Sequence, residues 1–227
     1  MKERPDHASK PRRFGPSKAK VHAAHGQAED QVVALIRSIL SRPRATIRDA
    51  ANLAGAPDDA LVTVAVIPMH GSRIIEIQVE NVAVNLRILL YRRFDGKPIL
   101  ENDRIDVSEE LQRQGHGARL IGRQVEHAIR LGVAEILAYA VRDDEAGDVG
   151  YWVWPLLGFD GRLPREVIER LPADLSSAQW VSELMKFEPG QSWWRSNGDS
   201  INLVFDLGPN SLDLRRFRGY LRQKGLP

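Results

Sequence analysis

The chain has 227 residues, with 32 lysines and arginines against 30 aspartates and glutamates, so its net charge of +2 says little about partners. It contains no cysteine, which excludes disulfides, thiolate catalysis and cysteine-ligated zinc or iron–sulfur sites. No apolar run approaches the roughly 20 residues of a membrane span, and the polar beginning is unlike a secretory signal peptide, so we expect a cytoplasmic protein without membrane contact.

Residues 1–29 are rich in lysine, arginine and proline and almost lack large apolar side chains. This composition buries too little surface to fold alone, so we predict a disordered basic tail. A solubilising leader or linker is the favoured interpretation, and contact with nucleic acid is the alternative. Residues 30–56 are expected to form a helical segment, with one helix from Asp30 to Pro43 and a second that Thr46 or Asp49 caps.

Residues 57–227 are expected to form the main domain. Its first part predicts four successive strands as an antiparallel meander, over 61–68, 73–79, 82–94 and 100–107. Apolar residues at helical spacing then run to Gly132, and the apolar stretch 133–141 is typical of a buried strand parallel to 100–107. The fold class is therefore mixed α/β, with a mostly antiparallel central sheet flanked by helices.

The last third of the sequence predicts a helical insertion over 163–186, followed by a C-terminal hairpin. Its strands are 192–195 and 200–207, and Asn197-Gly198 between them is the strongest short hairpin signal. The final helix has an apolar stripe and a strongly basic remainder. A solvated charged face is the common explanation for such a remainder, and an acidic partner is the alternative.

The most informative stretch lies where the strand 100–107 gives way to a helix, and it contains two glycines in a G-x-G spacing. Glycine lets the backbone approach a ligand closely, and a helix N-terminus offers unpaired N–H groups to an anion. Such a turn suits a pyrophosphate. Its candidate binding residues are Gln112, Arg113, Gln114, Gly115, His116, Gly117 and Ala118.

Gln112-x-x-Gly115-x-Gly117 resembles the acyl-CoA signature (Arg/Gln-x-x-Gly-x-Gly/Ala) of the Gcn5-related N-acetyltransferase (GNAT) superfamily. The block 150–160, which contains Gly158-Phe159, resembles the next helix of that family. The resemblance implies the acyl-CoA N-acyltransferase fold and direct transfer of an acetyl group from acetyl-CoA to an amine. It also implies that a backbone N–H near Val107 polarises the thioester carbonyl.

The candidate general bases are Glu101 and Asp103. In the predicted register they share a strand face with Ile105 and Val107, where a carboxylate can meet the incoming amine. The alternative is that both are solvent-facing charges at an irregular strand end.

The candidate general acid departs from the family pattern. Many relatives place a tyrosine four residues before the glycine of the Gly-Phe pair, where this sequence has Trp154. Tyr151 lies one helical turn earlier and is the candidate substitute, with Tyr139 as a second. The alternative is that these aromatic residues pack the core or line a cleft.

Two further functions stay open. One is a catalytically weak or inactive GNAT-fold binding module that contacts a protein partner, and the other is a nucleic-acid binder that uses the basic tail. The sequence contains no metal-ligand spacing and no P-loop. It leaves open the amine acceptor, a small molecule or a protein, and also the oligomeric state.

Overall fold

The computed structural model describes residues 14–112, 114–143 and 148–227. The strands are β1 Lys20–Ala23, β2 Leu61–Met69, β3 Ser72–Glu80, β4 Val84–Arg92, β5 Pro98–Val107, β6 Glu135–Ala140, β7 Arg142–Asp143, β8 Asp148–Val149 and β9 Ile201–Asp206. The helices are α1 Glu29–Leu40, α2 Ile47–Leu53, the 3₁₀ turn η1 Glu109–Leu111, α3 His116–Leu131, α4 Gly150–Leu156, α5 Arg165–Ile168, α6 Val181–Leu184, α7 Glu188–Asn197 and α8 Leu212–Gln223.

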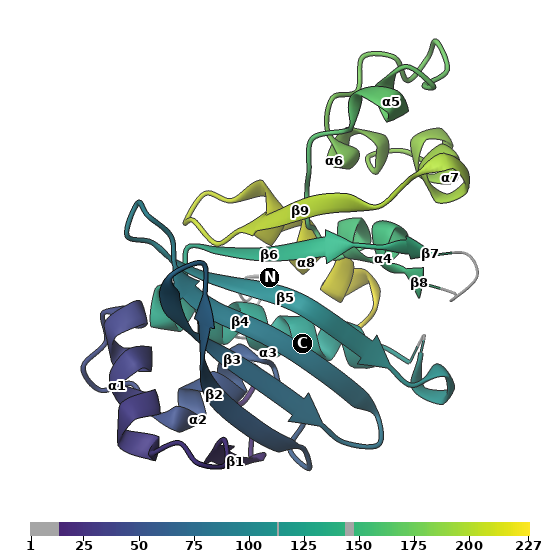
Figure 1. Cartoon of the computed structure of the whole chain (residues 1–227). Helices are drawn as coiled ribbons and strands as arrows, with labels where there is room; N and C mark the ends of the chain where they lie inside the picture. The colour runs from purple at the N-terminus through teal and green to yellow at the C-terminus, as the bar shows by residue number, and fades with distance from the viewer. Residues whose placement is uncertain (1–13, 113, 144–147) are drawn as a thin grey trace, which may run out of the picture.

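Within these residues, seven strands form one sheet in the order β1-β2-β3-β4-β5-β6-β9 (Figure 1). Strands β2 to β5 are an antiparallel meander, β5 and β6 are parallel across the α3 crossover, and β9 is antiparallel to β6. The predicted mixed, mostly antiparallel α/β fold is therefore confirmed, including the parallel pair on either side of α3.

Alternation along the meander creates one apolar face. Val64, Ile77 and Ile88 are aligned in neighbouring strands, and all three side chains are fully buried. Figure 1 shows α2 and α3 behind the sheet and α1 beside it, and Ile36 of α1 and Leu53 of α2 are fully buried in the same core. The apolar stripes of the helices and this sheet face thus enclose a single core. The near face of β2 to β5 carries no described helix.

The predicted tail over 1–29 is wrong from residue 14 onward, and residues 1–13 lie outside the described part. β1 pairs in parallel with β2, from Lys20 opposite Leu61 to Ala23 opposite Val64. Before it, the backbone N–H of Phe14 donates to Glu126 at 2.8 Å. Composition alone does not reveal this strand, because β1 is stabilised by pairing with a strand that is distant in the sequence and not by its own residues.

The predicted C-terminal hairpin is also wrong, because 192–195 lies inside helix α7 and only β9 joins the sheet. Trp194 is fully buried, and its indole N–H donates to the backbone carbonyl of Tyr151 at 2.9 Å. Asn197 and Gly198 end the helix, since the N–H of Gly198 donates to the carbonyl of Trp194 at 2.7 Å. Burial of one large ring in a helix outweighs a local turn signal. The helical insertion predicted over 163–186 is present as α5 and α6, and α7 extends it beyond the predicted bounds (Figure 1).

Candidate functional site

An opening in the sheet lies between the parallel strands β5 and β6. Their pairing runs only from Ile99 opposite Glu135 to Asn102 opposite Ala138. β5 continues to Val107 without a described partner on that side. The strands therefore part beyond Asn102 and leave an edge of β5 whose backbone groups can bond an extended ligand.

The glycine loop lies at the end of this opening. Gly115 has φ +80° and precedes α3, and among the described residues no atom beyond the adjacent backbone lies within 4 Å of a Cβ built on Gly117. No described residue accepts a hydrogen bond from the backbone N–H of Gly115, His116, Gly117 or Ala118. The first turn of α3 holds no acidic residue. The loop thus presents backbone donors that have no acceptor among the described residues, together with the positive end of a long helix.

Side chains of the same loop hold its shape. The amide of Gln112 donates to the carbonyl of Val107 at 3.1 Å, and that of Gln114 donates to the carbonyl of Glu110 at 2.7 Å. The structure therefore brings together the predicted residues Val107, Gln112, Gln114, Gly115, His116, Gly117 and Ala118. Arg113 lies outside the described residues.

A buried polar pair fixes α3 against the opening. The side chains of Asn102 and Gln124 exchange two hydrogen bonds of 3.0 and 2.8 Å, and both residues are buried. Asn102 belongs to the last paired position of β5 before the strands part. A reciprocal amide pair satisfies both groups inside the core, so it sets the position of the helix along the strand.

Sequence reasoning missed one cation, Arg119. Its guanidinium donates to the carbonyl of Gln114 at 3.1 Å and has no ion-pair partner within the described ranges. It lies one turn into α3, on the exposed side of the loop. The signal available in the sequence was a basic residue two positions after the second glycine.

The predicted register around Glu101 and Asp103 is wrong because β5 contains a bulge. Arg87 of β4 pairs with Arg104 while its neighbour Ile88 pairs with Asn102, so Asp103 is the extra residue. An extra residue reverses the alternation of faces. Ile105 and Val107 therefore share the helix-covered face with Asn102, whereas Glu101 lies on the open face.

The open face holds two carboxylate networks. The guanidinium of Arg87 pairs with Asp103 at 2.7 Å and with the nearly buried Glu76 at 2.5 Å, and these bonds raise the pKa of Arg87. The hydroxyl of Tyr91 donates to Glu101 at 2.9 Å. Burial, together with the adjacent carboxylate, raises the pKa of Tyr91 well above its ordinary value. Asp103 is thus held in an ion pair with Arg87. Glu101 accepts only a hydrogen bond from a neutral hydroxyl, so it is more available than Asp103 to take up a proton.

Tyr151 is placed for packing. The residue is 6% exposed, its hydroxyl donates to the carbonyl of Arg195 at 2.6 Å, and the guanidinium of Arg142 lies 5.1 Å from its ring centre. Because its proton is committed to a backbone carbonyl of α7, the hydroxyl is not free to protonate a ligand in this conformation. The predicted role as acid therefore has no geometric support. Tyr139 is 58% exposed.

Trp154, at the position of the family's tyrosine, begins a chain of aromatic contacts. Its ring centre lies 4.6 Å from that of Phe159, which lies 5.1 Å from Phe205, and Phe205 lies 5.8 Å from Phe217. Edge-to-face contacts of this kind stabilise a core beyond their buried area. They join α4, β9 and α8.

Within the described residues no group of histidine and carboxylate side chains is arranged to hold a metal ion. None of the described helices combines the length and the apolar character needed to cross a bilayer.

No protein-family model and no curated protein matches this sequence. Among solved structures, the chain is similar to a mutant of the toxin AtaT bound to the C-terminus of the antitoxin AtaR, at 16% identity and a TM-score of 0.28. The match covers 47% of this chain and 65% of the toxin chain, slightly under two thirds. A second structure of that complex, which also contains acetyl-CoA, gives the same values.

The loading GNATL domain of CurA from Lyngbya majuscula is similar at 12% identity and a TM-score of 0.29, over 58% of this chain and 76% of that one. Structural similarity this partial gives no information about the activity of this chain. The mixed α/β fold therefore rests on this chain's own strand order, the α3 crossover and the loop before α3.

Proposed function

We propose that this chain is an acetyl-CoA-dependent N-acetyltransferase in which an amine attacks the thioester directly. The observation that carries the proposal is the set of backbone N–H groups from Gly115 to Ala118, at the start of α3, that have no acceptor among the described residues and follow the unpaired end of β5. Phosphate oxygens are strong acceptors, and a helix N-terminus favours their charge. The GNAT resemblance of the same residues supports acetyl-CoA as the donor.

In this proposal Gly115, His116, Gly117 and Ala118 bind the pyrophosphate through their backbone, and Arg119 adds a side-chain cation. The unpaired edge of β5 between Asn102 and Val107 receives the extended arm of the donor. A backbone N–H near Val107 then donates to the thioester oxygen as negative charge develops there.

The transfer step is the same in every such reaction. The amine nitrogen bonds to the carbonyl carbon, the carbon–sulfur bond breaks, and coenzyme A leaves as the thiolate. One proton must leave the nitrogen, and we assign its uptake to Glu101, directly or through water. Asp103, held by Arg87, instead positions the bulge. No tyrosine acid is required, because a thiolate is a tolerable leaving group.

A panel of amines tests the proposal, with released thiol as the readout. The panel includes small amines and peptides with free N-terminal and lysine amines. Glu101→Gln is expected to lower kcat by about 10²–10⁴-fold with little change in acetyl-CoA affinity. Glu166→Gln, on exposed helix α5, is the matched control and should leave kcat unchanged. Equal activity of Glu101→Gln and the intact protein would exclude the assignment.

A second function is a coenzyme-binding module without turnover, and the packed states of Tyr151 and Trp154 favour it. The two functions share the loop before α3 and differ only in chemistry. Acetyl-CoA binding without thiol release on any amine would support the module. Release that depends on Glu101 would exclude it.

A further inference from the structure

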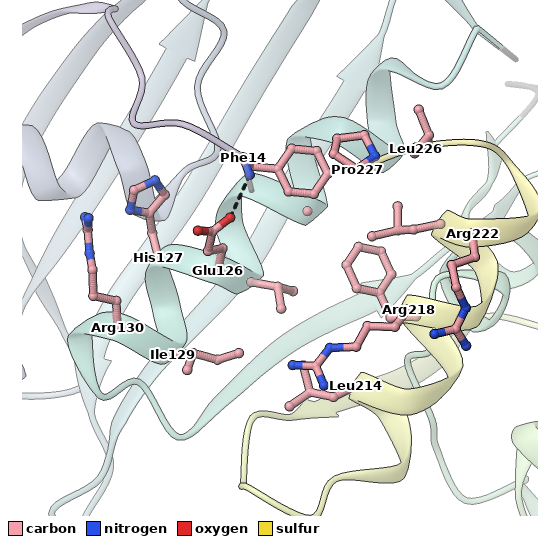
Figure 2. Close-up of a pocket in the computed structure, with 14 residues that line it drawn as sticks. Phe14, Glu126, His127, Ile129, Arg130, Leu214, Arg218, Arg222, Leu226 and Pro227 are labelled. Carbon is pink, nitrogen blue, oxygen red and sulfur yellow. Dashed lines mark hydrogen bonds between the residues drawn. The ribbon is translucent and has the colours of Figure 1, made fainter. Parts of the chain in front are cut away.

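A second feature of the molecule is a groove between α3 and α8 (Figure 2). It encloses about 690 Å³, and its floor is made of apolar side chains: Val125, Ile129, Leu214, Phe217 and Leu221. Phe14, Leu226 and Pro227 close one end. Ile129 projects from α3 towards α8 and is 41% exposed, which is high for an isoleucine.

The groove continues past Ile129 into a second hollow of about 530 Å³. The two hollows share Ile129, Leu214 and Arg218, and the second extends to Leu207 and Ser211. Together they follow the whole of α8, whose 12 residues span roughly 18 Å at 1.5 Å per residue. An elongated trough of three helical turns suits a helix better than a compact small molecule.

One lip of this trough is strongly basic. Arg215, Arg218 and Arg222 follow each other at one-turn spacing on α8, all exposed, and none has an ion-pair partner in the described part of the chain. Like charges at this spacing repel one another in an isolated helix. The three arginines therefore repel one another when the chain is alone. Carboxylates of a bound partner would attract them and offset this repulsion.

The charge of the stripe argues against the chain's own beginning as the occupant. Residues 1–13 carry more basic than acidic side chains, namely Lys2, Arg4, Lys10, Arg12 and Arg13 against Glu3 and Asp6. A nucleic acid would satisfy the arginines but would leave the apolar floor uncovered. An occupant must therefore combine negative charge with an apolar surface.

We infer that the α3–α8 trough is a docking site for an amphipathic helix of a partner protein, with an apolar stripe flanked by glutamates or aspartates. The apolar stripe covers Ile129 and the floor, and the acidic flank meets Arg215, Arg218 and Arg222. Burial of the apolar surface supplies affinity, and the arginines supply orientation and faster association. The inference does not rest on the proposed acetyl transfer, and the residues that line the trough differ from those assigned to that function.

Fluorescence anisotropy with a designed peptide tests this inference. The probe is a labelled helix of about 18 residues, with leucines along one face and glutamates on both sides of it. Arg218→Glu/Arg222→Glu should weaken its binding by tenfold or more, and Ile129→Asp, an exposed position, should also weaken it. The double substitution Arg165→Glu/Arg170→Glu, with Arg165 on α5 and Arg170 in the turn after it, makes the same charge change outside the trough and should not weaken binding. A peptide with lysines in place of the glutamates should recover affinity for the Arg218→Glu/Arg222→Glu variant.

Three results would overturn the inference. The first is equal peptide binding by Arg218→Glu/Arg222→Glu, the trough variant, and by the control variant Arg165→Glu/Arg170→Glu. The second is equal binding of a peptide with the same composition but scattered leucines, which would show attraction by charge alone. The third is tight binding to vesicles of anionic phospholipid or to RNA, lost in the trough variant, with no binding of the amphipathic peptide.

Discussion

Replacing Gly117 with glutamate should separate anion binding from folding. Gly117 is the second residue of α3, its backbone does not adopt a positive φ, and a Cβ there meets nothing within 4 Å. A helical glycine is less favourable than most residues by roughly 1 kcal/mol. A carboxylate in the first turn adds about 0.3–1 kcal/mol through the helix dipole. The variant should therefore be more stable than the intact protein.

The same carboxylate would stand where a pyrophosphate is proposed to bind. Two unit charges about 4 Å apart repel by about 4 kcal/mol at an effective dielectric constant of 20. Partial exposure and salt reduce this repulsion, so we expect a loss of about 3 kcal/mol, roughly a hundredfold in Kd. Gly219→Glu is the matched control, because Gly219 of α8 also has open space around its Cβ.

Calorimetric titration with acetyl-CoA, paired with thermal unfolding, measures both effects. For a chain of this length, stabilisation by 1 kcal/mol raises Tm by about 2–4 °C. For Gly117→Glu we expect a higher Tm together with acetyl-CoA binding weakened by roughly a hundredfold, and for Gly219→Glu we expect unchanged binding. Unchanged acetyl-CoA binding by Gly117→Glu would refute the assignment of the loop. A lower Tm would refute the account of its backbone.

Three further predictions concern packing and pH. Gly122→Ala should destabilise the fold by about 1–3 kcal/mol in denaturant unfolding, because a Cβ would lie 2.3 Å from the Phe14 ring, and adding Phe14→Ala should remove most of that loss. Burial, then the charge of Arg130, lowers the pKa of His127 below its ordinary 6.5, so the unfolded chain takes up the proton first. Stability should be complete above about pH 6.5 and fall towards pH 5, and the fall should be smaller in His127→Leu; equal slopes for both proteins would contradict this. Trp194→Ala should cost about 3–5 kcal/mol and speed proteolysis within residues 161–198, whereas unaltered cleavage would show that the buried indole does not anchor the insertion.

The periodicity of the sequence predicted those elements whose conformation depends on neighbouring residues. The strands of the meander alternate apolar and polar side chains between short turns, so their bounds in the sequence and in the structure nearly coincide. The loop before α3 was predictable for the same reason, since two glycines at the start of an amphipathic helix act on their own neighbours.

The errors arose where distant contacts decide the conformation. β1 is ordered by β2, some 40 residues later, and α7 is ordered by the burial of Trp194. The bulge at Asp103 leaves no signal in the sequence, yet it moved Glu101 to the opposite face from Ile105. Arg119 was overlooked because its proposed role depends on exposure beside the loop, which composition does not reveal.

The insertion between β6 and β9 has a consequence for the order of folding. Strands β2 to β5 meet through short turns, whereas β9 must close a loop of about 60 residues before it pairs with β6. Loop closure is an entropic cost that precedes any gain from contacts, so pairings with low sequence separation form earlier. We expect the meander with α3 to form the nucleus, during synthesis as well as on refolding. Changes within the insertion should then accelerate unfolding while they leave the folding rate nearly constant.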